Sequence, residues 1–326
     1  MERRAFVATV TASILVGPLA VEARPTVRVV RVGVLRPAPD NPVFRQNFEG
    51  FRQRLSEQGY AEGQNLRIEY RLAAGPEAVD DVAAELVRSK PDVIVALAPA
   101  GVVAARKVTT TIPIVAVDLE SDPVAAGFVA SLARPGGNIT GVFLDFPELA
   151  GKWLEMLKEA APKISRVAVL WDPTTGPAQV RAAETAAQTL ALRLQRLEVR
   201  GPNDYEAAFR SAARDQAGAM LILSSPVFNT SRKQLVDLTL RYRLAGIMTF
   251  PDYADDGGLL AYGPPLFSLF GQAGVIVGRV LKGTPPSVIP VERPTRFELA
   301  INLRTAKALG LTIPQSLLVR ADRVIE

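Results

Sequence analysis

Residues 29–60 read VVRVGVLRPAPDNPVFRQNFEGFRQRLSEQGY, and this stretch decides the fold class. Residues 29–35 form a short apolar run rich in β-branched side chains, which is typical of a strand buried in a parallel sheet. Apolar residues then recur at spacings of four, three and four, which predicts a helix over residues 42–58 that ends at Gly59. Its buried face is expected to comprise Phe44, Phe48, Phe51 and Leu55.

The same strand and helix pattern recurs along the chain, with a break near Phe146. Further strands are expected at 66–71, 93–98, 112–118 and 139–144, and after the break at 167–171, 194–199, 219–224, 246–250 and 259–262. Helices are expected between them at 79–87, 100–108, 124–132, 149–160, 178–192, 205–214 and 232–244. Strands separated by helices of this length form parallel sheets with right-handed crossovers.

After residue 263 the chain is expected to return to both halves through a helix at 266–281, a proline-rich connector, a strand at 297–303 and a helix at 305–309. The sequence therefore predicts an α/β protein of two doubly wound parallel-sheet lobes joined by crossing hinge segments. Lobe I is expected to comprise residues 28–145 and 264–285. Residues 146–263 and 286–326 are expected to form lobe II and the hinge segments.

The first residues have the layout of an export signal. Arg3 and Arg4 precede an apolar run over 5–20, and small residues lead to Ala23, where we expect cleavage of a signal peptide at 1–23. A membrane anchor fits less well, because Pro18 interrupts the run and a span needs roughly 20 apolar residues. General and twin-arginine export both fit. With no cysteine there is no lipid anchor, so a periplasmic location is expected.

The chain contains no histidine and no cysteine. These absences exclude a Ser–His–Asp triad and a thiol nucleophile, and they leave zinc only carboxylate ligands. The sequence also lacks a P-loop and a complete dinucleotide fingerprint. The net charge of +5 is carried by scattered residues rather than by a basic run. We therefore expect no enzymatic activity, no cofactor, no metal and no nucleic-acid partner.

Polar and aromatic side chains follow the expected strands in both halves, at the edge where open α/β sheets bind ligands. Two such edges facing each other would form a cleft. The candidate ligand-binding residues are Asp40, Asn41, Pro99, Ala100, Asp118, Asp145, Asp172, Ser224, Phe228, Asp252 and Tyr253. Many of the Asp and Ser residues also fit as helix N-caps, worth about 1 kcal/mol each. Capping does not require both halves to be polar at the same edge, so the cleft is the better explanation of the whole set.

The residue types indicate how such a cleft would hold a ligand. Carboxylates bind an ammonium group, whereas hydroxyls and helix N–H groups bind a carboxylate. Aromatic rings stack on a flat or apolar ligand. We expect Asp118, Asp145 and Asp172 to anchor a cationic group, with Ser224 and the loop after the first strand at its other end.

Several segments are similar to a known family. The longest is 122–141, which begins DPV and ends SLARPGGNITG. The others are EGQN at 62–65, IEYR at 68–71, RVAVLW at 166–171, PTRFEL at 294–299, residues 302–311 and RAD at 320–322. In this order the set resembles the substrate-binding proteins of ABC transporters, in the group that includes tryptophan and tyrosine importers.

That resemblance implies the type 1 periplasmic binding protein fold, in which crossing segments join two α/β lobes. It is weaker in the cleft loops at 144–145 and 224–229, so the identity of the ligand does not carry over. The sequence as a whole predicts a periplasmic solute-binding protein that closes on a small molecule, with an amino acid as one option. Its expected partner is an ABC transporter permease in the inner membrane, and a monomer is expected. A ligand sensor for a membrane receptor fits the same sequence, and a carboxylate-based hydrolase fits it less well.

Overall fold

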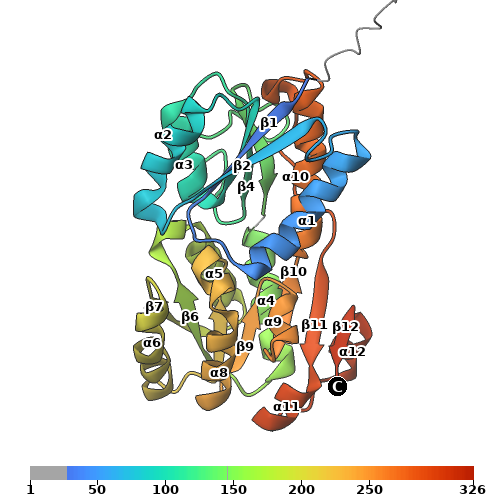
Figure 1. Ribbon diagram of the computed structural model, residues 1–326. Helices are drawn as coiled ribbons and strands as arrows, with labels where there is room; N and C mark the ends of the chain where they lie inside the picture. The colour runs from blue at the N-terminus through green and yellow to red at the C-terminus, as the bar shows by residue number, and fades with distance from the viewer. Residues whose placement is uncertain (1–27, 145) are drawn as a thin grey trace, which may run out of the picture.

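The structure is a computed structural model that describes residues 28–144 and 146–326. Two α/β lobes lie one above the other in Figure 1 and are joined at one side. The fold expected from the sequence is confirmed. The expected signal peptide at 1–23 and Asp145 lie outside the described residues. No helix within the described ranges has both the length and the apolar composition that a bilayer crossing requires.

Lobe I is built around a sheet of five parallel strands in the order β2-β1-β3-β4-β5. Its strands are β1 (Val30–Arg36), β2 (Leu66–Leu72), β3 (Val93–Leu97), β4 (Ile114–Asp118) and β5 (Ile139–Phe143). Its helical segments are α1 (Pro42–Glu57), η1 (Pro76–Ala78), α2 (Val79–Arg88) and α3 (Ala98–Val108).

Lobe II contains a seven-stranded sheet in the order β12-β11-β10-β9-β8-β6-β7. Its strands are β6 (Arg166–Trp171), β7 (Arg193–Glu198), β8 (Ala219–Ile222), β9 (Ala245–Met248), β10 (Leu260–Gly263), β11 (Glu298–Asn302) and β12 (Arg323–Ile325). The first five of these repeat the order of lobe I. The parallel pattern is broken only between β10 and β11, which are antiparallel because β11 arrives from the hinge side.

The helices of lobe II precede its first strand or lie between its strands. They are α4 (Phe146–Ala160), η2 (Pro173–Thr175), α5 (Ala178–Thr189), α6 (Pro202–Arg214), α7 (Pro226–Thr230), α8 (Arg232–Arg241), α9 (Asp252–Asp255), α11 (Leu303–Leu309) and α12 (Gln315–Arg320). Two helical segments belong to the connections between the lobes, α10 (Leu266–Leu281) and η3 (Pro286–Val288).

Helix α10 leaves lobe II after β10 and packs along α1 of lobe I (Figure 1). The apolar face expected on α1 is confirmed, since its four residues are buried. Phe48 lies 4.6 Å from Phe51 and 5.4 Å from Phe270 of α10 between ring centres. Glycines allow the two helices to approach closely: a Cβ atom on Gly50 would lie 2.1 Å from the carbonyl oxygen of Phe267.

The returning chain next runs beside β5 before it enters lobe II as β11. The Phe143 N–H donates to the carbonyl of Glu292 at 3.0 Å, and the Glu292 N–H donates to the carbonyl of Gly141 at 2.8 Å. The chain thus crosses between the lobes after β5, after β10 and before β11. These adjacent crossings place the hinge on one side and leave the facing sheet edges to form a cleft.

The prediction of a helix at 124–132 is wrong. The segment forms a single turn, in which Asp122 Oδ1 accepts from the N–H groups of Val124 and Ala125. Gly127 follows with φ of +66°, a left-handed conformation that ends the turn. The sequence also did not reveal α7, α12 and β12, which are all short. Periodicity is weak evidence over so few residues.

Candidate functional site

The cleft between the lobes lies where both sheets reverse their strand order. In lobe I, β1 and β3 are neighbours although β2 separates them in sequence, and β6 and β8 are the equivalent pair in lobe II. Ligands of doubly wound sheets bind beyond the carboxyl ends of the strands at such a switch point. Residues from both switch points line one cavity of about 80 Å³ between the lobes.

The walls of this cavity are mostly apolar. The apolar side chains that line it include Phe44, Leu97, Val117, Phe250, Leu266 and Phe270. The polar groups are Arg36, Asn47 and Glu120 from lobe I and Ser225 and Asn229 from lobe II. An apolar cavity with a few converging polar groups is characteristic of a site for a small molecule.

Arg36 ends β1 and is the cationic side chain of the cavity. Its guanidinium carbon lies 4.4 Å from the centre of the Phe44 ring, and Nη1 donates to the carbonyl of Pro39. Burial lowers the pKa of Arg36 to about 10, with Asp40 opposing the shift, so the group stays charged at neutral pH. Among the described residues the guanidinium forms no ion pair. Arginine has five N–H donors, so most of them can serve a bound carboxylate.

Two buried carboxyl groups, Asp118 and Glu120, lie at the end of β4, and Glu120 lines the cavity. Asp118 Oδ1 accepts from the N–H groups of Glu120 and Ser121, each at 3.0 Å. Its Oδ2 atom is buried and has no hydrogen-bond partner among the described residues. Burial raises the pKa of Asp118 to about 6. Burial, and then the charge of Asp118, raises the pKa of Glu120 to about 8. This pair therefore favours a cation or a proton as a neighbour.

Ser224 connects the two lobes at this point. Its hydroxyl donates to Glu120 Oε1 at 2.6 Å. Gln179 of α5 holds Ser224 in place, since its Nε2 donates to the Ser224 carbonyl at 2.8 Å and its Oε1 accepts from the Ser224 N–H at 2.7 Å. The contact with Glu120 therefore comes from a fixed position on lobe II.

Asp172 adds a third carboxyl group from the end of β6. Its Oδ2 accepts from the hydroxyl of Ser225 at 2.7 Å, and its Oδ1 accepts from the N–H of Thr174 at 2.9 Å. The second bond is the N-cap expected for such a residue. The charge of Asp172 also contributes to the raised pKa of Glu120. The two lobes thus bring Asp118, Glu120 and Asp172 into one buried acidic cluster.

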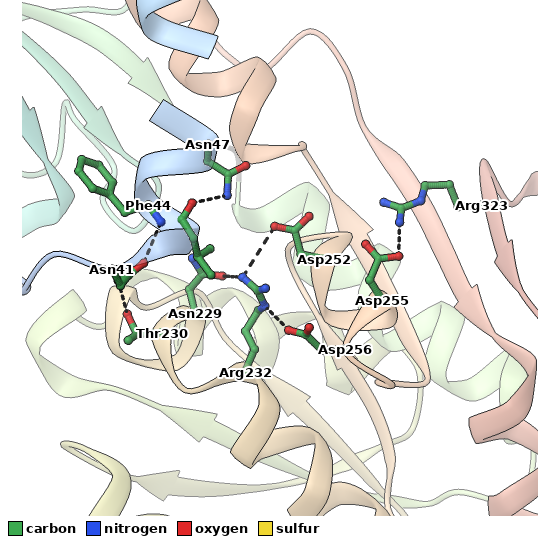
Figure 2. Close-up of polar contacts among 11 residues, drawn as sticks. Asn41, Phe44, Asn47, Asn229, Thr230, Arg232, Asp252, Asp255, Asp256 and Arg323 are labelled. Atoms are coloured by element: carbon green, nitrogen blue, oxygen red, sulfur yellow. Dashed lines mark hydrogen bonds and ion pairs between the residues drawn. The ribbon is translucent and has the colours of Figure 1, made fainter. Parts of the chain in front are cut away.

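A second contact between the lobes lies at the edge of the cleft, and Figure 2 shows it. Asn41 caps α1, because its Oδ1 accepts from the Phe44 N–H at 2.8 Å. Its Nδ2 lies 3.5 Å from Thr230 Oγ1 on α7, which is the outer limit of a hydrogen bond. Helix α1 of lobe I and α7 of lobe II therefore meet across the cleft.

The cavity residue Asn229 is positioned by Arg232, which itself forms two ion pairs (Figure 2). Arg232 Nη1 donates to Asn229 Oδ1 at 3.2 Å. The same guanidinium pairs with Asp256 at 2.8 Å and with Asp252 at 3.7 Å. Asp252 thereby helps to position Asn229.

Residues 32–325 match the model of a family described as ABC transporter substrate binding protein. The chain belongs to this family. A tyrosine-binding protein of Clostridioides difficile (strain R20291) is 27% identical over 287 residues, 83% of this chain and 79% of that protein. A crystal structure of a conserved domain protein from Vibrio cholerae has a TM-score of 0.85 and 25% identity, over 91% of this chain and 100% of the other. An ABC domain from Streptococcus pneumonia in complex with L-Trp has a TM-score of 0.83 and 23% identity, with the same coverage.

The expected site residues can now be placed in this substrate-binding protein. Asp118, Asp172 and Ser224 gather at the centre of the cleft, and Asn41 lies at its edge. Asp145 lies outside the described residues. None of the expected residues that the structure describes lines the cavity itself. The expected residues outside the contact between the lobes are Asp40, Pro99, Ala100, Phe228, Asp252 and Tyr253.

Local structure explains these positions. Asp40 forms an ion pair with Arg45 at the surface. Pro99 and Ala100 lie in the first turn of α3, next to Ala98, which does line the cavity. The rings of Phe228 and Tyr253 are fully buried in the core of lobe II, because the short helices α7 and α9 turn their apolar residues back onto the sheet.

The cavity also contains residues that the sequence did not single out. Glu120 lies two residues after Asp118, which the sequence had already placed at the cleft. Arg36 ends the first strand and Phe250 follows β9, so their positions after strands were a usable signal. Phe270 gave no such signal, because it lies in the middle of α10 and reaches the cavity only through the packing of α10 on α1.

Proposed function

We propose that this substrate-binding protein captures an amino acid with an apolar or aromatic side chain and delivers it to an ABC importer. The observation that carries the proposal is the charge pattern of the cavity. Arg36, a cationic group, and Glu120, a member of the buried acidic cluster, line the same cavity together with aromatic side chains. This arrangement complements the carboxylate, the ammonium and the side chain of an α-amino acid.

Each part of the ligand has a partner in this assignment. Arg36 binds the carboxylate through its unpaired N–H groups. Glu120 binds the ammonium, and the nearby charges of Asp118 and Asp172 strengthen that attraction. Phe44, Phe250 and other apolar lining residues receive the side chain. The names of two relatives support this class of ligand, since one is a tyrosine-binding protein and another was crystallised with L-Trp.

Capture follows from the two-lobe architecture. In an open state the walls of the cavity separate, and contacts such as Ser224 to Glu120 and Asn41 to Thr230 are lost. A ligand that touches both walls favours the closed state by the contacts that exist only when the lobes meet. The closed lobes then present a joint surface to the permease in the inner membrane. The ligand leaves unchanged, because the proposed role is binding in the periplasm and not catalysis.

Isothermal titration calorimetry with the standard amino acids tests this proposal. We expect saturable binding, one ligand per chain, for aromatic or large apolar L-amino acids. Failure of every such amino acid to bind would contradict the assigned ligand class.

Replacing Asp172 with alanine is expected to weaken binding of that ligand by about tenfold or more. The change removes a carboxyl group from the acidic cluster and frees the hydroxyl of Ser225, a cavity-lining residue of the same lobe that donates to Asp172. Calorimetry measures the effect. Asp122→Ala is the matched control, because Asp122 also caps a turn but is exposed and does not belong to the buried acidic cluster. Equal affinity in the Asp172 variant and the wild type would remove Asp172 from the site.

A further inference from the structure

Glu120 occupies an unusual place for an ionisable group. Its side chain is 4% exposed, and Ser224 of the opposite lobe donates to Oε1 at 2.6 Å. Its Oε2 accepts from the Leu119 N–H at 3.2 Å. Part of the environment of Glu120 is therefore supplied by lobe II and depends on closure of the lobes.

The charged groups that face Glu120 are mostly of its own sign. Asp118 lies beside it on lobe I, and Asp172 faces it from lobe II. Burial, with the charge of Asp172 as a smaller cause, raises the pKa of Tyr205 on α6 to about 12, so its phenol is neutral at ordinary pH. Arg36 shares the cavity but forms no ion pair with Glu120. Within the described residues, the acidic cluster thus has no positive partner, and Asp118 Oδ2 remains buried without any hydrogen bond.

We propose that Glu120 is the charge-selecting residue of the cleft, and that the lobes close only when its charge is neutralised by a cationic group of the ligand or, in the empty protein, by a proton. The ligand part of this inference rests on the proposed function. The proton part rests only on the geometry of the closed lobes.

The direction of the pH effect follows from linkage. In the closed, empty protein the pKa of Glu120 is raised to about 8, whereas an exposed glutamate has a pKa near 4.3. The closed state therefore binds the proton more tightly than the open state does. Closure without ligand is easiest at low pH and weakens, by up to about tenfold per pH unit, as the pH rises between these two values. Above the raised pKa of about 8, Glu120 is ionised in both states, and closure carries the full free-energy cost of burying its charge.

The same exchange discriminates between ligands. A ligand with an ammonium group replaces the proton, so its binding to the open protein at neutral pH needs no proton uptake. A ligand of the same shape without the amine must bind together with a proton. The affinity of this ligand is then expected to fall by up to about tenfold per pH unit between the pKa of an exposed glutamate, near 4.3, and the raised pKa of Glu120, about 8.

Small-angle X-ray scattering of the protein freed of ligand, between pH 5 and pH 9, tests the proton part. We expect the wild type to become more compact as the pH falls. Glu120→Gln removes the charge of residue 120 and should show a weaker pH dependence, with a larger closed fraction than the wild type at pH 9. Glu57→Gln, a surface change in lobe I, is the control and should behave as the wild type. The same pH dependence in wild type and Glu120→Gln, or no compaction of the wild type, would overturn the proposal.

A second variant, Ser224→Ala, tests the proton part independently if Glu120→Gln fails to fold. Ser224→Ala removes the bond between the lobes but keeps the carboxyl group, and it should show less compaction at every pH.

Calorimetry of L-tryptophan and of indole-3-propionate, in buffers of different ionisation enthalpy, tests the ligand part. We expect uptake of about one proton with indole-3-propionate and close to none with L-tryptophan. Equal uptake would contradict charge selection, whereas no binding of either would contradict the proposed function and leave the scattering result standing.

Discussion

Replacing Arg36 with methionine is expected to weaken binding of an amino acid by about tenfold to a hundredfold. A hydrogen bond to a charged group contributes about 1.5–3 kcal/mol, and the guanidinium is the cationic group of the cavity wall. Methionine retains an apolar stem against the Phe44 ring, so the loss reports on the charge. Titration calorimetry at neutral pH gives the affinity. The loss should be largely absent for a ligand whose carboxylate is replaced by a neutral amide.

Arg31→Met provides the matched control for Arg36. Arg31 lies on the same strand, β1, but at its exposed amino end, where its Nη1 donates to the carbonyl of Ser89. We expect this variant to bind with the affinity of the wild type. If the two variants lose affinity equally, or if neither does, Arg36 does not bind the carboxylate and the ligand has another orientation.

Replacing Gly141 with alanine is expected to lower the free energy of unfolding by about 3 kcal/mol or more. Gly141 lies in β5 with φ of +151°, a conformation that other residues rarely adopt. An added Cβ would lie 2.0 Å from the carbonyl oxygen of Ala116 in β4 and 2.6 Å from its nitrogen. Backbone strain and overpacking each cost of the order of 1–3 kcal/mol. The change would also disturb the pairing of Gly141 with Glu292 in the returning hinge segment.

Denaturant unfolding followed by circular dichroism measures this effect. Gly137→Ala is the control, because a Cβ at Gly137 would meet no heavy atom within 4 Å. Its free energy of unfolding should stay within about 0.5 kcal/mol of the wild type. A Gly141 variant as stable as the Gly137 variant would mean that β4 and β5 can separate without cost.

Much of the fold was predictable because its elements are long and regular. The periodic aromatic face of α1 predicted both the helix and its burial, and the alternation of strands and helices predicted two similar sheets. The segment at 124–132 misled the prediction, since apolar residues at helical spacing also suit a single turn that buries Phe128 and Val129. Short elements such as α7 contain too few residues to show any period.

The site was only partly predictable, for a geometric reason. A rule about strand ends finds residues such as Asp118, Asp172 and Ser224, because backbone topology alone places them at the cleft. It does not determine which way a side chain turns after the strand. Phe228 turned into the core, whereas Phe270 reached the cavity from a helix of the hinge. The importance of Glu120 emerges only when the opposite lobe supplies Ser224.

The central claim is that two lobes enclose an amino acid with an apolar or aromatic side chain and release it unchanged. Native mass spectrometry of the purified protein, followed by denaturation and identification of what is released, tests this most directly. We predict one bound molecule per chain that carries both an amine and a carboxylate and is recovered intact. A protein that retains no such molecule and takes up none when amino acids are added, or that releases a chemically altered product, would contradict the claim.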